Sequence, residues 1–193
     1  MSAAEDHITN EPGVPYFITL SVVDWVDIFI RPIYKNVIVD ALNLFIEKNG
    51  LLVYSWCLMT NHLHLVAKAK ETFQWAYILR EFKRLTSKEV LAALSIETEP
   101  ECRREWLLKR FQSPATLTKR TGQIHFWQDG NHPLYLETGN PEIILERISY
   151  VHDNPVRDLI VDAAEAYMYS SAKDYAGKKG LVNVSVYEFS ISK

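Results

Sequence analysis

Short apolar segments rich in β-branched and aromatic side chains, alternating with polar residues in places, are typical of β-strands. Two such segments meet at Thr60 and Asn61, a pair that favours a tight turn, so these strands are expected to form a hairpin. The five predicted strands are Val14–Trp25, Leu51–Thr60, His62–Ala69, Pro133–Leu136 and Leu181–Ile191.

Apolar residues three and four positions apart predict helices between these strands. Pro32 stands near the start of the first helix and Gly50 at its end, as helix boundaries favour. Pro155 disfavours helical geometry at the residue before it, so the last helix is expected to end at Asn154. The predicted helices are Arg31–Gly50, Phe73–Ser95, a short one over Glu101–Phe111, and Asn140–Asn154.

This order of elements predicts an α+β fold, a ferredoxin-like sandwich whose mostly antiparallel sheet has helices packed mainly on one face. Residues 1–13 are polar and acidic and end at Pro12 and Gly13, so a flexible leader is expected there. Residues 14–193 have the length of a single domain. The charged and irregular stretch 96–121 is expected to be an insertion in that domain.

The composition, with 48% hydrophobic and 23% charged residues, is that of a globular domain. Its apolar runs are too short and too often interrupted by charges to span a membrane, and the first residues lack the features of a secretory signal. Two cysteines, Cys57 and Cys102, do not make a disulfide framework. We therefore expect a protein of a bacterial-type cytoplasm, with a nucleus as the alternative.

The formal net charge of −3 and the isoelectric point of about 6.1 argue against a protein that coats nucleic acid, because phosphate contacts need Lys and Arg. Positive residues are nevertheless clustered in parts of the chain. One cluster lies largely on the polar side of the second predicted helix and comprises Arg80, Lys83, Arg84 and Lys88. Such a helix face can contact a DNA backbone, although it is more often simply solvated.

The segment MTNHLHLVAK, residues 59–68, carries two histidines one residue apart on a predicted strand. Because side chains alternate between the two faces of a strand, His62 and His64 share one face, and Leu63 and Leu65 share the other. Neutral imidazole is the commonest metal-ligating side chain, and this spacing lets two imidazoles converge on one ion. On its own, a His-x-His pair more often marks two histidines on a half-exposed strand.

The last predicted helix contains SYVHDNP, in which Tyr150 and Asn154 are four residues apart and lie on one face. A phenol can act as a nucleophile, and a carboxamide oxygen one turn away can bind a hard cation. A tyrosine on the polar side of a helix is more often a half-buried packing residue.

In combination, these motifs resemble the single-tyrosine HUH transposases and, more narrowly, the REP-associated tyrosine transposases related to the IS200/IS605 group. The resemblance runs from about Val14 to Gly180, and the joint order of the motifs is more specific than any one of them. The segments that carry it are FITLSVVDW, MTNHLHLV, FKRLTS, FWQDGNHPLYL, ISYVHDNPVRDLIV and MYSSAKDYAG.

The resemblance implies a single HUH transposase-like domain over 14–193 that nicks single-stranded DNA near the bacterial nucleoid. Tyr150 would attack a phosphodiester, leaving a 5′-phosphotyrosine link and a free 3′-hydroxyl, and the 3′-hydroxyl of a second strand would resolve the link. Since a phenol ordinarily ionises near pH 10, its attack benefits from charge stabilisation at the phosphate. The resemblance assigns this to Mg²⁺ or Mn²⁺ bound by His62, His64 and Asn154.

The implied partner is single-stranded DNA that contains a hairpin. Its backbone would contact Arg80, Lys83, Arg84 and Lys88, and Trp127 would stack on unpaired bases, although a tryptophan at such a position is more often a core residue. The overall acidity and the length of the 96–121 segment depart from the family pattern.

Two other functions stay open at this point. An inactive relative would bind hairpins or single-stranded nucleic acid without cleaving them. A phosphoesterase would use the histidine pair to activate water and would form no covalent intermediate. The oligomeric state, monomer or homodimer, is also open, and a tail that covers the sheet edge would favour the monomer.

Overall fold

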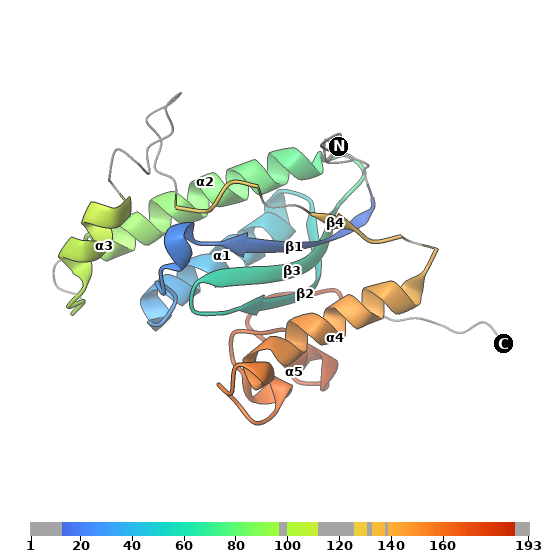
Figure 1. Ribbon diagram of the computed structural model, residues 1–193. Helices are drawn as coiled ribbons and strands as arrows, with labels where there is room; N and C mark the ends of the chain where they lie inside the picture. The colour runs from blue at the N-terminus through green and yellow to red at the C-terminus, as the bar shows by residue number, and fades with distance from the viewer. Residues whose placement is uncertain (1–12, 97–99, 112–125, 131–132, 138, 188–193) are drawn as a thin grey trace, which may run out of the picture.

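The computed structural model, which describes residues 13–96, 100–111, 126–130, 133–137 and 139–187, contains a four-stranded antiparallel sheet (Figure 1). The strands are β1 (Pro15–Ser21), β2 (Leu51–Leu58), β3 (His62–Ala69) and β4 (Leu134–Tyr135), in the order β2-β3-β1-β4. Helices pack on this sheet, so the predicted α+β class is confirmed, as is the hairpin formed by β2 and β3.

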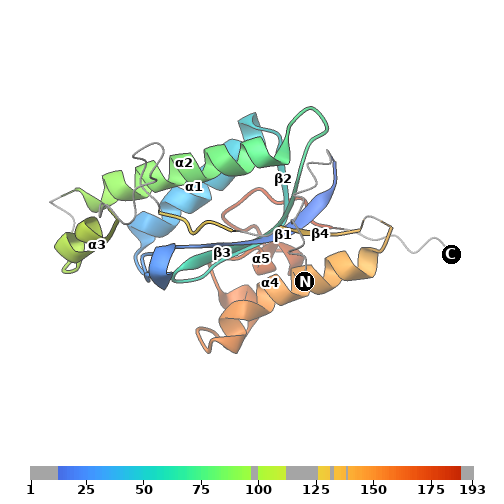
Figure 2. The ribbon, with the colours of Figure 1, turned by 45° about the horizontal axis from the view of Figure 1, so that its top comes forward.

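Two long helices, α1 (Pro32–Lys48) and α2 (Trp75–Leu94), cover one face of the sheet, and α3 (Arg104–Phe111) lies beside α2 (Figure 2). The predicted arrangement of helices mainly on one face agrees with α1, α2 and α3, whereas α4 (Pro141–Arg157) covers the other face. That face carries the apolar side chains of Phe17, Cys57 and Val66, which pack with α4. Sequence alternation alone did not reveal that both faces of the sheet are largely apolar.

The main core lies between the sheet and the α1–α2 layer. Ile18 and Leu20 of β1 and Leu63 and Leu65 of β3 are buried there together with residues of both helices. Because side chains alternate along a strand, this burial directs Thr19, His62 and His64 to the opposite face. The register of β1 against β3 then sets Thr19 directly across from His64.

Most predicted element boundaries agree with the structure within a few residues. The first strand is shorter than predicted, because Val23–Trp25 form a 3-10 turn, η1. Helix α4 does not end at Asn154 but continues through Pro155 to Arg157. Pro155 is buried, and its carbonyl and that of Asn154 accept hydrogen bonds from Ile160 and Asp158, which stabilises the helix end despite the proline.

The expected leader and insertion fall largely outside the described residues, which exclude 1–12, 97–99 and 112–125. The described part of the 96–121 stretch includes α3, close to the predicted short helix. Leu107 and Phe111 of α3 are fully buried in the main core, so this helix is an integral part of the fold.

The chain after α4 lies along the outer edge of β2. It includes the short helices η2 (Ala164–Ala166) and α5 (Ala172–Tyr175). The backbone N–H of Leu58 donates to Tyr169 O (2.9 Å), and that of Ser185 donates to Val53 O (2.8 Å). The predicted strand at 181–191 is absent over the described residues 181–187, because Leu181 and Asn183 bond to Asn43 of α1 and form no ladder.

Within the ranges that the structure describes, every helix is too short or too polar to span a bilayer.

Gly50 ends α1 at a position that no other residue fits. Its φ is +70°, and a Cβ atom there would overlap the ring of Phe73. We expect Gly50→Ala to lower the free energy of unfolding by at least about 2 kcal/mol, measured by urea denaturation. The matched control is Gly177→Ala, where φ is +73° but the space is open, so only backbone strain of about 1 kcal/mol applies. Equal losses in the two variants would contradict this explanation.

Candidate active site

His62 and His64 converge on the sheet face that α4 covers. Their Nε2 atoms lie 3.0 Å apart. His62 Nδ1 is 2.7 Å from Asn61 Oδ1, and His64 Nδ1 is 2.8 Å from Thr19 Oγ1. An Nδ1–H that donates to each oxygen leaves the Nε2 lone pairs directed at the space between the rings, which is the tautomer that a metal-binding histidine needs.

Both imidazoles are held in the neutral form. Burial lowers the pKa of His62, and burial together with the neighbouring His62 lowers the pKa of His64 to about 3. Neutral imidazoles with facing lone pairs suit a shared cation, because two nitrogens bound side by side at about 2.1 Å from one ion lie about 3 Å apart. The residues present therefore fit a divalent metal.

Helix α4 brings Tyr150 and Asn154 to the same place. The Tyr150 ring lies edge-on to His64 with 5.7 Å between ring centroids, and Phe17 contacts both rings. Burial lowers the pKa of His64, a side-chain interaction with Asn154 partly opposes this shift, and Asn154 Nδ2 donates a hydrogen bond to Tyr150 O (2.6 Å). The structure thus brings His62, His64, Tyr150 and Asn154 together from a strand and a helix far apart in the sequence.

Acidic side chains do not complete a metal site here. In the described part of the chain, no three His, Cys, Asp or Glu side chains converge as metal ligands. A metal at this position would depend on the two imidazoles and a neutral amide. Such a set leaves coordination positions for substrate oxygens and water.

The position of α4 is fixed by both apolar and polar contacts. Ile144, Ile148 and Val151 are buried against the sheet. One residue further on, the buried His152 points away from the site, with Nε2 2.8 Å from Ser171 Oγ. Ser171 Oγ in turn accepts the backbone N–H of Trp56 in β2 (2.9 Å). This chain of hydrogen bonds ties the tyrosine helix to the sheet edge.

Arginines near Tyr150 were missed in the sequence. The guanidinium of Arg157 lies 5.2 Å from the centre of the Tyr150 ring, and that of Arg147 lies 5.8 Å from the Phe17 ring. Tyr150, Asn154 and Arg157 follow helical spacing on one face. This spacing can be read from the sequence, but the predicted helix ended at Asn154 and so did not include Arg157. Thr19 could not be found at all, because its role depends on strand register.

The basic residues of α2 are not part of this cluster. Helix α2 lies on the other side of the sheet from α4 (Figure 1). Lys83 is half-buried, and its Nζ donates to Gln128 O (3.0 Å). The side chains of Arg80, Arg84 and Lys88 are exposed, and each lies within ion-pair distance of Glu81 or Glu89.

Trp127 is a core residue, which contradicts its predicted role in stacking on bases. Its side chain is only 4% exposed, packs against Phe29 and Phe126, and donates from Nε1 to Thr86 Oγ1 (2.9 Å). The backbone around it pairs with Val22 beyond the end of β1. Burial against β1 and α2 therefore removes the ring from any ligand.

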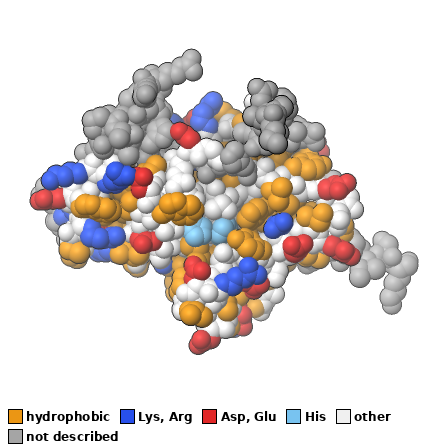
Figure 3. Space-filling view, in the orientation of Figure 1, with side chains coloured by type: hydrophobic (Ala, Val, Ile, Leu, Met, Phe, Trp, Pro, Cys, Tyr) orange, Lys and Arg blue, Asp and Glu red, His pale blue; other side chains and the backbone are white. Residues whose placement is uncertain are grey.

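The surface above the histidines is accessible. Figure 3 shows histidine atoms near the middle of the molecular surface, with hydrophobic side chains on both sides and a basic group below them. His62 and Tyr150 are partly exposed, whereas His64 is buried. A polymer strand on this surface could therefore reach the phenol and His62 together.

A comparison with solved structures supports the fold. A solved REP-associated tyrosine transposase bound to a REP hairpin matches this chain with a TM-score of 0.58 and 14% sequence identity, over 100% of this chain and 98% of that one. No protein-family model and no curated protein matches the sequence. At this identity the similarity shows a shared fold.

The burial of His152, whose Nε2 lies 2.8 Å from Ser171 Oγ, makes the stability of the fold depend on pH. Burial lowers the pKa of His152 from 6.5 to about 4, so within this window the unfolded chain binds a proton that the folded chain does not. The free energy of unfolding should therefore fall, by up to about 3 kcal/mol from this residue, as the pH drops from 6.5 towards 4. In His152→Gln, which keeps a side-chain hydrogen-bonding group, urea denaturation should show a weaker pH dependence; a profile identical to wild type would refute the assignment.

Proposed function

We propose that this protein nicks single-stranded DNA and transfers the strand, with Tyr150 as the nucleophile and a transient 5′-phosphotyrosine link. The observation that carries the proposal is the contact of the Tyr150 ring with His64, whose Nε2 faces that of His62 at 3.0 Å. A nucleophile beside two neutral imidazoles is the arrangement that metal-assisted phosphodiester cleavage requires. The shared fold with a tyrosine transposase supports the same reaction class.

The chemistry requires no external energy source. Tyr150 Oη attacks the phosphorus, a new P–Oη bond forms, and the P–O3′ bond breaks. The phenolic proton is lost as Oη attacks, and the 3′ oxygen leaves as a hydroxyl after taking up a proton. A 3′-hydroxyl from a second strand then attacks the same phosphorus and releases the tyrosine, so the number of phosphodiester bonds is conserved.

The residues that would hold a divalent metal, Mg²⁺ or Mn²⁺, are His62, His64 and Asn154. A bound ion supplies Lewis-acid polarisation of the scissile phosphate. Asn61 and Thr19 orient the imidazoles through Nδ1, and such supporting hydrogen bonds strongly affect metal affinity. The nitrogen ligands make Mn²⁺ the more favourable of the two ions.

Arg157 is proposed to assist the phenol. Its guanidinium lies close to the Tyr150 ring, where a positive charge stabilises the negative charge that develops on the phenol oxygen and on the phosphate. Arg147 lies three residues before Tyr150 on the same helix, and its guanidinium is next to the Phe17 ring. We propose that it contacts the phosphate from the side of Tyr150 opposite to Arg157. These two arginines supply positive charge that the chain as a whole lacks.

The proposed partner is single-stranded DNA with a hairpin, since the structural neighbour was solved with a hairpin bound. His64 and Tyr150 meet within one chain, which supports catalysis by a single protomer. Helix α2 lies on the face of the sheet opposite α4, and its exposed basic residues are therefore remote from the candidate site. We propose Arg80, Arg84 and Lys88 only for contacts with DNA that extends beyond the site.

The test of the nucleophile is a covalent adduct. Incubation of the protein with labelled single-stranded DNA and Mn²⁺ should give a protein–DNA species that resists denaturant, and Tyr150→Phe should abolish it while retaining DNA binding. Tyr77→Phe, an exposed tyrosine on α2, serves as the matched control and should form the adduct normally. Cleavage that persists in Tyr150→Phe would identify a phosphoesterase that uses water, and binding without cleavage in wild type would identify an inactive binding module.

The metal proposal predicts a defined effect of Thr19→Val. This nearly isosteric change removes the hydroxyl beside His64 Nδ1, so the Mn²⁺ concentration that restores half-maximal adduct formation after EDTA treatment should rise about 10–100-fold. Thr72→Val, at an exposed turn residue, is the control and should leave the titration unchanged. Adduct formation that survives EDTA in wild type would remove the metal from the mechanism.

A further inference from the structure

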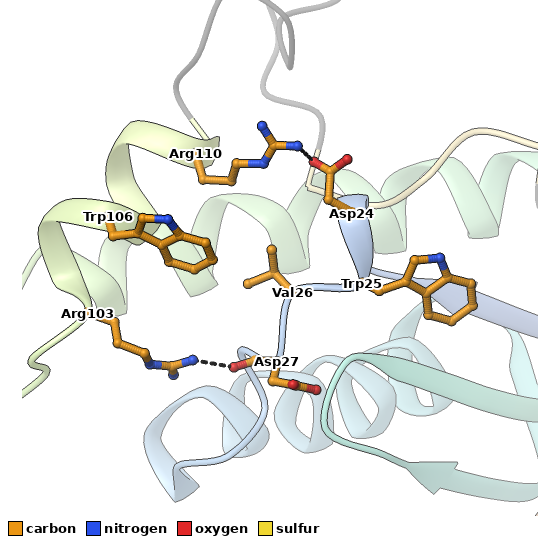
Figure 4. Close-up of a pocket in the computed structure, with 7 residues that line it drawn as sticks. All are labelled: Asp24, Trp25, Val26, Asp27, Arg103, Trp106 and Arg110. Carbon is orange, nitrogen blue, oxygen red and sulfur yellow. Dashed lines mark hydrogen bonds and ion pairs between the residues drawn. The ribbon is translucent and has the colours of Figure 1, made fainter.

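A hollow of about 660 Å³ lies between η1 and α3. Val26 forms its floor, and Figure 4 shows side chains of Arg103, Trp106 and Arg110 reaching towards it from the α3 side. These three residues are spaced three and four apart, so they share one face at α3. One wall of the hollow therefore belongs to the stretch 96–121 that was predicted to be an insertion, and the other is formed by residues 24–27.

The charges around the hollow are balanced. Arg110 forms an ion pair with Asp24, and Arg103 Nη1 donates to Asp27 O (2.8 Å). With two arginines and two aspartates lining it, the hollow carries no net positive charge to attract a phosphate. It suits a neutral, flat group with polar edges, and a nucleobase has this chemistry.

The hollow also holds the two exposed tryptophans of the chain. Trp25 and Trp106 are 57% and 54% exposed, whereas Trp56, Trp75 and Trp127 are at most 4% exposed. The two exposed indoles lie on opposite sides of Val26 (Figure 4). Exposed aromatic rings beside a cavity are typical of ligand-binding surfaces and are the usual platform for unpaired bases.

Trp25 is held in place at a conformational cost. Asp24 and Trp25 have φ values of 54° and 55°, in the left-handed region that non-glycine residues rarely adopt. Such strain persists where the surroundings impose it, and it concentrates at binding sites. Here the side-chain amide of Asn61 imposes it in part, because Nδ2 donates to Trp25 O (3.2 Å) and to Asp27 Oδ1 (2.9 Å).

The hollow adjoins the candidate active site through Trp25 and Asn61. The Trp25 ring lies edge-on to His62, with 6.2 Å between centroids, and the same Asn61 that bonds to η1 is 2.7 Å from His62 Nδ1. A strand whose phosphate lies beside His62 therefore has its neighbouring bases next to Trp25.

We infer that this hollow binds unpaired nucleobases of the single-stranded DNA whose phosphodiester reaches Tyr150, with Trp25 and Trp106 as separate stacking platforms. The inference rests on the proposed function and adds a binding subsite to it. Trp25 serves the base next to the scissile phosphate, and Trp106 serves a base further along the strand.

The test measures intrinsic fluorescence and affinity with a mixed-sequence single-stranded oligodeoxynucleotide at fixed salt. DNA should quench the fluorescence of wild type, because the two exposed indoles are the ones it can reach. Trp106→Leu keeps an apolar side chain but removes the aromatic face, so we expect affinity to fall about tenfold or more and part of the quenching to disappear. Trp106→Phe should retain most of the affinity, and Tyr77→Ala on α2 should bind as wild type.

The Trp106 variants should fold as the wild type does, because Leu107 and Phe111 anchor α3 in the core. The thermal unfolding temperature of each variant checks that they are folded. Equal affinity of Trp106→Leu, Trp106→Phe and wild type, or an absence of quenching at saturating DNA, overturns the inference. The adduct assay on the same samples separates the two proposals. If wild type forms the Tyr150 adduct but Trp106→Leu binds DNA as tightly as wild type, the proposed subsite is wrong and the proposed nuclease activity stands. If DNA quenches the fluorescence and Trp106→Leu binds more weakly but wild type forms no adduct, the subsite stands and the proposed nuclease activity is wrong.

Discussion

Helix α4 packs its apolar stripe against the face of the sheet that carries His62 and His64, and the candidate site depends on this contact. Burial of Ile144, Ile148 and Val151 fixes the rotation of the helix, and the polar side that carries Tyr150, Asn154 and Arg157 then lies beside the imidazoles. The same contact removes His64 from water and keeps it neutral. Hydrophobic packing thus determines both the position of Tyr150 and the protonation of the neighbouring imidazoles.

Local charge at the site differs from the charge of the whole chain. The net charge of −3 is unfavourable for DNA, yet Arg157 lies beside the Tyr150 ring, with Asp153 at the limit of ion-pair distance (4.0 Å), and Arg147 lies beside Phe17. The exposed basic residues of α2 each lie within ion-pair distance of a glutamate. Two guanidinium groups are therefore close to the position where negative charge would develop in the proposed phosphoryl transfer. This arrangement favours action at one phosphodiester over broad binding to a DNA backbone.

Asn61 connects the parts of the molecule that the proposals use. Its side chain contacts His62, the backbone of Trp25 and the carboxylate of Asp27. One turn residue between β2 and β3 therefore orients a candidate metal ligand and holds the strained η1 segment. Helix α3, anchored in the main core, supplies the other wall of the hollow, so the described part of the 96–121 stretch is built into the surface next to the site.

The sequence determined most of the elements and the faces of the strands, because periods of two and of three to four residues are local properties; the strand predicted at 181–191 is the exception over residues 181–187. It paired His62 with His64 and Tyr150 with Asn154, since each pair lies within one element. It could not determine what crosses between elements: that α4 covers the second face, that Trp127 is buried, that Thr19 supports His64 from 45 residues away, or that α3 meets η1. These contacts between elements depend on strand register and helix packing, in which side chains from distant parts of the chain compete to be buried against the same surface. Only the tertiary structure decides that competition.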